Sequence, residues 1–271
     1  MTRYDMHAAF SNKQEVIDIL QAICKQLEQN NPHDFFRPRI GIFVQADCCL
    51  KSNPSKYSII PTFTCNFNTL SGDDAESIMN NIMDILFKYD TSGILKNNLL
   101  RVRCEGQLSI LKFNPESDSM KYVESIPKNF PTKVQDLQYF DAHIHILGLT
   151  KENVLEKWAI AANIGAELDM PIIINKLKVE QGIVKPFLTK RWYNVSLDEA
   201  IKSLGETYKI IYKMLNDIGL KVTLMPEFEV TMNDPDCQVT DQGWMPTPFC
   251  VFKLNEDHCV LPGSIFESII N

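Results

Sequence analysis

The chain has 271 residues, 45% of them apolar, which is enough to bury a core in each of two modules of roughly 100 residues. Its formal net charge of −7 argues against a general nucleic-acid or membrane-surface binder, because phosphate backbones attract basic patches. No apolar run approaches the roughly 18 to 20 residues that a membrane-spanning helix needs. The eight cysteines form no C-x-x-C pair, which favours reduced thiols in a cytoplasmic protein.

Hydrophobic periodicity divides the first half of the chain into strands and helices in the order β-α-β-β-α-β. The predicted strands cover residues 2–10, 39–46, 57–67 and 99–113, and the predicted helices cover residues 14–29 and 74–89. This order is that of the ferredoxin-like fold.

The second half repeats the order, with predicted strands over residues 139–147, 171–179, 184–193 and 222–231 and predicted helices over 153–168 and 197–218. Residues 61–75 align without a gap on residues 186–200, with five identities in fifteen positions. In both copies a serine stands three residues before a carboxylate, Ser71 before Asp74 and Ser196 before Glu199. This is the spacing of a capping box, which starts a helix.

We therefore predict an α+β fold made of two tandem duplicated ferredoxin-like (βαββαβ) modules with antiparallel sheets, plus a C-terminal extension. The predicted boundaries are 1–115 for module one, 116–136 for a linker, 137–232 for module two, and 233–271 for an extension that covers or braces module two.

Each ferredoxin-like sheet packs its helices on one face and leaves the other face open, so period-two alternation sorts the side chains. Both modules begin with a strand that carries Asp-x-His, Asp5 to His7 and Asp141 to His143. Alternation gathers polar side chains on the open face of module two: Asp141, His143, His145, Thr189, Arg191, Tyr193, Glu227 and Glu229. Module one has a thinner set: Asp5, His7, Thr62, Thr64, Asn66, Arg101, Arg103 and Glu105.

The polar set of module two suits acid–base chemistry, because a histidine beside a carboxylate can be oriented and tuned towards neutral pH. We predict as catalytic residues His143, His145, Glu227 and Glu229. Arg191, with Thr189 beside it, is suited to hold a phosphate or carboxylate through paired hydrogen bonds. The predicted ligand-binding residues are Asp141, Thr189, Arg191, Tyr193 and, from the extension, Asp241 and Trp244.

Two further interpretations of the histidines stay open. His143 and His145 lie two apart on a strand beside carboxylates, which are the ligand types that zinc or manganese takes, although spacing fixes no further ligand. In the other interpretation these histidines contact Glu227 and Glu229 across the strand pair and make a polar sheet surface. The second interpretation is favoured over a divalent metal.

A duplicated α+β protein with one histidine motif in each half, as at His7 and His143, resembles the 2H phosphoesterase superfamily in outline. Members of that superfamily place two His-x-Thr/Ser motifs across a cleft, whereas this chain has Ala9 and His145 two residues after its histidines. The resemblance implies a hydrolase that handles a phosphoester.

The predicted function is thus a phosphoester- or nucleotide-handling enzyme that uses the open face of module two. The alternative is a non-catalytic binding module that docks a protein or a small anionic ligand on the same face. In a third interpretation the two faces pack on each other or form a homodimer. Loss of turnover in histidine-to-alanine variants would favour the enzyme, whereas loss of a partner in Arg191→Glu would favour the binding module.

Overall fold

The structure is a computed structural model. It describes residues 2–30, 37–46, 57–69, 72–108, 110–128, 130–134, 138–150, 153, 157, 160–161, 164–165, 167–168, 170, 172–175, 183–184 and 186–233.

The first half of the chain forms the strands and helices that periodicity predicts, with small shifts at their ends. The elements are β1 (Thr2–Phe10), α1 (Gln14–Asn30), β2 (Arg37–Ala46), β3 (Tyr57–Thr69), α2 (Gly72–Tyr89), α3 (Ile94–Asn98) and β4 (Leu99–Gln107). The predicted strand 99–113 is too long, because β4 ends at Gln107 and a separate hairpin follows. In that hairpin β5 (Leu111–Asn114) pairs with β6 (Ser119–Tyr122).

The second half also follows the predicted order within the described residues. Its elements are β7 (Tyr139–Leu147), β8 (Leu149–Thr150), β9 (Ile172–Asn175), β10 (Ile183–Val184), β11 (Phe187–Tyr193), α5 (Leu197–Asp217), β12 (Lys221–Val222) and β13 (Glu227–Asn233). The predicted strand 222–231 is split into β12 and β13, with Pro226 between them; a proline lacks the N–H that a continuous ladder requires. Much of the predicted helix 153–168 lies outside the described residues.

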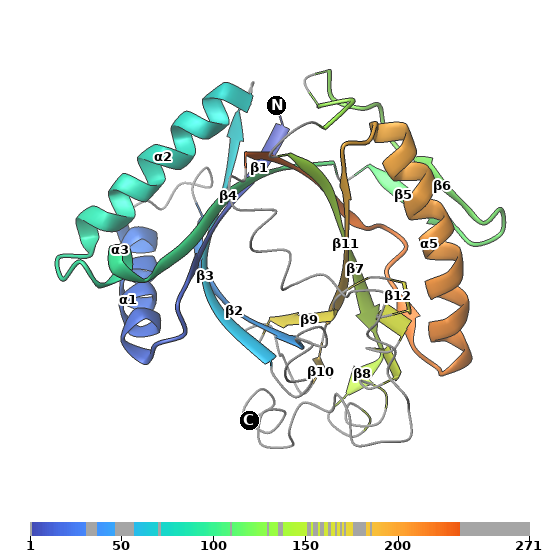
Figure 1. Cartoon of the computed structure of the whole chain (residues 1–271), viewed down its shortest axis with the longest axis horizontal. Helices are drawn as coiled ribbons and strands as arrows, with labels where there is room; N and C mark the ends of the chain where they lie inside the picture. The colour runs from blue at the N-terminus through green and yellow to red at the C-terminus, as the bar shows by residue number, and fades with distance from the viewer. Residues whose placement is uncertain are drawn as a thin grey trace.

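The two halves join into one curled antiparallel sheet (Figure 1). The strand order is β2-β3-β1-β4 in the first half and β9-β11-β7-β13 in the second, which is the order of strands in a ferredoxin-like sheet. Two seams join the halves: β13 pairs with β4, and β2 pairs with β9. Together these pairings close a ring, with β12 paired outside it on the end of β7.

Because the two sheets close into one ring, the prediction that each sheet leaves an open face is wrong. Helices α1 and α2 lie outside the first half of the ring and α5 lies outside the second half, so the polar faces point into the ring (Figure 1). Strands twist, and a twisted sheet of this many strands can curl until its edges pair. We call the surface that these polar side chains line the inner face.

Each half has its own hydrophobic core between the sheet and its helices. On β7, the alternate residues Phe140, Ala142 and Ile144 are fully buried with Leu204 and Tyr208 of α5 in the second core. In the first core, the alternate β1 residues pack with α1 and α2. The predicted capping box of α5 is confirmed, since Ser196 and Glu199 bond each other's backbone N–H groups, whereas Ser71 lies outside the described residues.

The segment predicted as a linker packs against the second half. Phe113 of β5 and, further along the chain, Phe130 and Val134 belong to the second core. The backbone of Lys133 forms an isolated antiparallel β-bridge with Ser196, just before α5. The boundary predicted at residue 115 therefore falls inside the β5–β6 hairpin. Among the helices of the described part of the chain, none is long and apolar enough to span a membrane.

Candidate functional site

The inner face of the first half holds a buried ion-pair cluster around Glu105 of β4. The Glu105 side chain is fully buried; its Oε1 lies 3.0 Å from Arg103 Nε and its Oε2 lies 2.9 Å from His7 Nε2. Burial alone would raise the pKa of the Glu105 carboxyl, but Arg103 and His7 outweigh burial and hold that pKa well below its usual range.

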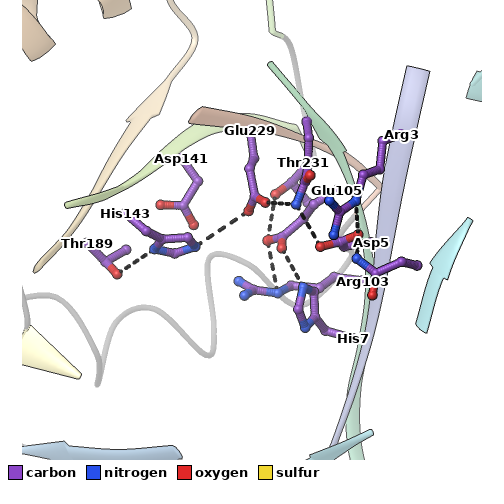
Figure 2. Close-up of polar contacts among 12 residues, drawn as sticks. Arg3, Asp5, His7, Arg103, Glu105, Asp141, His143, Thr189, Glu229 and Thr231 are labelled. Atoms are coloured by element: carbon purple, nitrogen blue, oxygen red, sulfur yellow. Dashed lines mark hydrogen bonds and ion pairs between the residues drawn. The ribbon is translucent and has the colours of Figure 1, made fainter. Parts of the chain in front are cut away.

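The inner face of the second half holds a corresponding pair, His143 of β7 and Glu229 of β13. His143 Nε2 lies 3.5 Å from Glu229 Oε2, and His143 Nδ1 lies 2.9 Å from Thr189 Oγ1 of β11. Figure 2 shows the imidazole between these two partners. The side chains are 12% and 4% exposed, respectively, so His143 is the member of the pair that is more open to solvent.

Both groups of this second pair titrate far from their ordinary range. Burial raises the pKa of Glu229 to about 7, and repulsion from Glu105 adds to the rise while His143 opposes it. Burial alone would lower the pKa of His143, but Asp141 and Glu229 raise it to about 9. Since the two groups interact, the pair takes up and releases protons as a unit.

Strand register places the two pairs in equivalent positions. Asp5 is opposite Glu105 in the β1–β4 ladder, and Asp141 is opposite Glu229 in the β7–β13 ladder. In each half the histidine two residues after the aspartate therefore contacts the glutamate diagonally. A threonine is also opposite each histidine on the other side, Thr64 opposite His7 and Thr189 opposite His143.

The residue directly opposite each histidine differs between the halves. Arg103 is opposite His7, whereas Glu227 is opposite His143. Arg103 supplies the positive charge that keeps Glu105 ionised. Glu227 supplies a negative charge instead, and its side chain is 54% exposed and lies 3.4 Å from His145. The first half thus makes a compensated ion cluster, whereas the second half holds a glutamate whose pKa is about 7.

Arg191, the predicted anion clamp, is already engaged. Its Nε lies 3.1 Å from Asp141 Oδ2, and its guanidinium carbon lies 4.9 Å from the centre of the Tyr139 ring. Tyr193 packs its ring against the same Tyr139. The Tyr139 hydroxyl also accepts hydrogen bonds from Arg101 and Arg103, at 3.1 and 3.3 Å. Arg101, Arg103 and Arg191 of the inner face are therefore engaged by carboxylates or by a phenol.

One amide joins the two halves at the β4–β13 seam. Gln107 Nε2 donates to Asp5 Oδ2 at 2.7 Å and to Glu229 Oε1 at 3.0 Å. At the symmetric place in the seam, Thr231 Oγ1 donates to Glu105 Oε1 at 3.5 Å. Sequence reasoning missed Gln107, although its parity with Arg103 and Glu105 along the strand would have placed it on the same face.

The predicted site residues thus divide into three groups. His143, Glu229, Asp141, Thr189, Arg191 and Tyr193 come together on the inner face, and the cross-strand contacts of His143 with Glu229 and of His145 with Glu227 are confirmed. His145 and Glu227 lie in a more exposed part of that face. Asp241 and Trp244 lie outside the described residues. Within the described residues, no group of three or more His, Cys, Asp or Glu side chains is placed to hold a metal ion.

No family model and no curated protein matches the chain. Among solved structures, a protein named "putative monooxygenase" from Fusobacterium nucleatum is 12% identical, with 83% of this chain and 94% of that chain covered and a TM-score of 0.24. Another of the same name from Lactobacillus acidophilus is 9% identical, with 85% and 93% covered and a TM-score of 0.24. A "putative chlorite dismutase", TA0507, is 7% identical, with 90% and 99% covered and a TM-score of 0.24. Superpositions this loose carry no argument about this chain.

The prediction of a phosphoester- or nucleotide-handling enzyme is wrong. Arg191, the predicted anion clamp, is paired with Asp141. A phosphate on this face would also meet the carboxylates of Asp5, Glu105 and Glu229. The alternative of a face that docks a protein or a small anionic ligand stays a prediction, although Arg103 and Arg191 of this face are already paired with Glu105 and Asp141. The homodimer and the cytoplasmic location stay predictions.

Proposed function

We propose that this chain is an acid–base enzyme that moves a proton on a small, uncharged organic molecule, with His143 as the catalytic residue and Glu229 as its proton partner. The observation that carries the proposal is the contrast between two equivalently placed carboxyls, Glu105 with a lowered pKa and Glu229 with a pKa near 7. Environments that push the pKa values of like groups apart are a mark of acid–base sites.

The protonation of the pair suits chemistry at neutral pH. With the pKa of Glu229 at about 7 and that of His143 at about 9, the pair holds between one and two protons there, so it can donate one and accept one back. His143 is the partly exposed member and contacts the substrate, and Glu229 exchanges the proton with it across their 3.5 Å contact. Thr189 orients the imidazole through Nδ1.

The charges of the inner face indicate the class of substrate. Asp5, Glu105, Asp141 and Glu229 bring four carboxyls to this face, and the arginines that contact the first three, Arg3, Arg103 and Arg191, are each paired with one of them. An added anion would be repelled, so the substrate is uncharged there. A carbonyl compound fits: a C–H bond next to the carbonyl breaks, its proton passes to the pair, and the pair returns a proton to the carbonyl oxygen, giving the enol.

Deuterium exchange tests this without knowledge of the natural substrate. A panel of small ketones and aldehydes is incubated with the protein in D2O, and loss of the proton signal next to the carbonyl is followed by NMR. We expect exchange above the solvent rate for at least one compound, and a loss of about 10²- to 10⁴-fold in His143→Gln, the usual contribution of a positioned acid or base.

The matched control is His7→Gln, which changes the equivalent histidine of the first half. It should keep exchange within about threefold of the parent, the expectation for a change outside the proton-transfer pair. Absence of exchange across the panel, or full exchange by folded His143→Gln, would remove the proposal.

We also propose that the two halves descend from a tandem duplication of a ferredoxin-like module. The gap-free alignment of residues 61–75 on 186–200 pairs Thr64 with Thr189, and both threonines are opposite the histidine of their own half. Sequences of relatives should keep this alignment and repeat their identities at inward positions of the two halves. Relatives whose halves align better in another register would count against the duplication.

A further inference from the structure

The two halves meet at Gln107, and its side chain makes the only described amide link between a carboxyl of β1 and the carboxyl of Glu229. One nitrogen, Nε2, donates to Asp5 Oδ2 at 2.7 Å and to Glu229 Oε1 at 3.0 Å. Both hydrogens of the amide are thus used on carboxylates. Asp5 is held from its other side by Asn66 Nδ2, at 2.5 Å from Oδ1.

We propose that Gln107 is a positioning residue that holds the Glu229 carboxylate at the seam and sets how readily it takes a proton. The proposal rests on the proposed function in one respect, that Glu229 exchanges a proton with His143. Through Gln107, the first half of the chain controls the pair carried by the second half.

The groups that face Glu229 come from each neighbouring strand of the ring. On β7 they are Asp141 and His143, on β4 they are Glu105 and Gln107, on β1 it is Asp5, and from β11 Arg191 neutralises Asp141. The charges of Glu105 and Asp5 make Glu229 harder to ionise, whereas His143 makes it easier. Of these neighbours, Gln107 is the neutral donor, and a donor favours the ionised form of the carboxyl that accepts from it.

Gln107 also separates two like-charged groups. Asp5 and Glu229 both accept from the same nitrogen, so without the amide they would face each other across the seam. Burial already raises the pKa of Asp5. Loss of the donor therefore makes both carboxyls hold their protons more tightly, and the proton-exchange range of the His143–Glu229 pair moves to higher pH.

The test measures the titration of Glu229 itself. The ¹³C signal of its side-chain carboxyl is followed against pH in labelled protein and is assigned by its loss in Glu229→Gln. In Gln107→Leu the midpoint should rise by about 1 pH unit, the size expected for loss of one hydrogen bond to a charged group. In Gln107→Glu, which keeps the shape but adds a like charge, the rise should be larger.

Thr231→Val is the matched control, because Thr231 donates to Glu105 at the symmetric place in the seam. It should leave the Glu229 midpoint within about 0.3 pH units, since it removes no donor from that carboxyl. If Gln107→Leu does not fold, Gln107→Met keeps the length of the side chain and should give the same rise. A Glu229 midpoint unmoved in the folded Gln107 variants would overturn the proposal.

Failure of this proposal and failure of the proposed function are distinguishable. A midpoint that rises as expected in protein that exchanges no deuterium would keep the positioning role and reject the enzyme. Deuterium exchange by the parent protein, together with an unmoved Glu229 midpoint in the Gln107 variants, would keep the enzyme and reject the positioning role. When both hold, the acid side of the pH profile of exchange should shift with the Glu229 midpoint, and a merely structural role of Gln107 would not move it.

Discussion

His7 and Glu105 in the first half of the ring have the same strand register as His143 and Glu229 in the second, yet the two pairs behave differently. In the first pair the glutamate stays ionised, and in the second it titrates near neutral pH. Arg103 compensates the charge of Glu105, whereas burial and the charge of Glu105 raise the pKa of Glu229 and His143 only partly opposes them. The comparison indicates that equal strand register does not fix the protonation of a buried glutamate, which depends on the charges around it.

Removal of the charge from each glutamate should have unequal effects on stability. Glu105→Gln leaves Arg103 without its carboxylate partner at a mostly buried site, so we expect a loss of about 3 to 5 kcal/mol in the free energy of unfolding. Glu229→Gln should change it by less than about 1 kcal/mol, because burial already opposes the ionised form of Glu229. Urea unfolding at pH 7 measures both, and equal losses would break the comparison.

The pH dependence of stability should also depend on the second pair. The pKa of His143 is raised from 6.5 to about 9 in the folded state, so its contribution is fully present below pH 6.5 and is lost as the pH rises to 9. At 1.36 kcal/mol per unit, the contribution is at most about 3 kcal/mol. The free energy of unfolding, measured between pH 6.5 and 9, should fall with rising pH in His7→Gln as in the parent protein. In His143→Gln this fall should be absent.

Glu229 contributes in the same direction at lower pH. Its folded-state pKa is raised from 4.5 to about 7, so the folded protein binds more protons than the unfolded chain and stability falls as the pH rises from 4.5 to 7. Glu105 has the opposite effect in a lower pH range. Its lowered pKa adds stability that is lost only as the pH falls below the ordinary range of a glutamate. Glu229→Gln should therefore flatten the fall between pH 4.5 and 7.

Glu227→Arg makes the second half resemble the first. An arginine opposite His143 should lower the Glu229 midpoint by about 1 to 3 pH units, the effect of an adjacent opposite charge on a carboxyl. Glu227 is more than half exposed, so the change should be tolerated. The ¹³C titration of the Glu229 carboxyl measures the shift, with Glu227→Gln as the variant that only removes charge. A midpoint that stays near 7 with arginine present would show that Glu227 does not make the difference.

The smallest expected effect concerns the two threonines. Thr189→Val removes the hydroxyl that lies 2.9 Å from His143 Nδ1 and should cost about 1 kcal/mol, the net value of one hydrogen bond. Thr64→Val changes the equivalent residue of the first half, which has no such contact with His7 among the described residues, and should cost less than about 0.5 kcal/mol. Thermal unfolding at one pH compares the two.

Much of the local structure, and the face of the sheet on which each side chain lies, can be predicted from the sequence. Alternation along residues 139–147 separates Phe140 and Ile144, which are buried in the second core, from Asp141 and His143 on the inner face. Serine at 196 and glutamate at 199 begin α5 as their spacing predicts. These signals are short-range, because each depends on residues a few positions apart.

The closure of the ring has no comparable signal. The alternation of side chains along β4 and β13 does not indicate that these strands pair with each other, because the same alternation would be found if both were free edge strands. The contrast between Glu105 and Glu229 depends on this closure and on diagonal contacts within the ladders. The role of Gln107 was missed for the same reason, because its acceptors Asp5 and Glu229 lie 102 and 122 residues away along the chain.

Strand β13 lies between β4 of one half and β7 of the other, and this has a consequence for how the chain folds. Its neighbours come from distant parts of the sequence, so bringing it into place requires closure of very long loops, which is slow. The first half can bury its own core before that step, whereas the second core includes Phe228 and Val230 of β13. Glu229 likewise meets His143 and Gln107 only when β13 is inserted. Native-state hydrogen exchange at the amide of Val230 should therefore report the opening of the ring and the disassembly of the site as a single event.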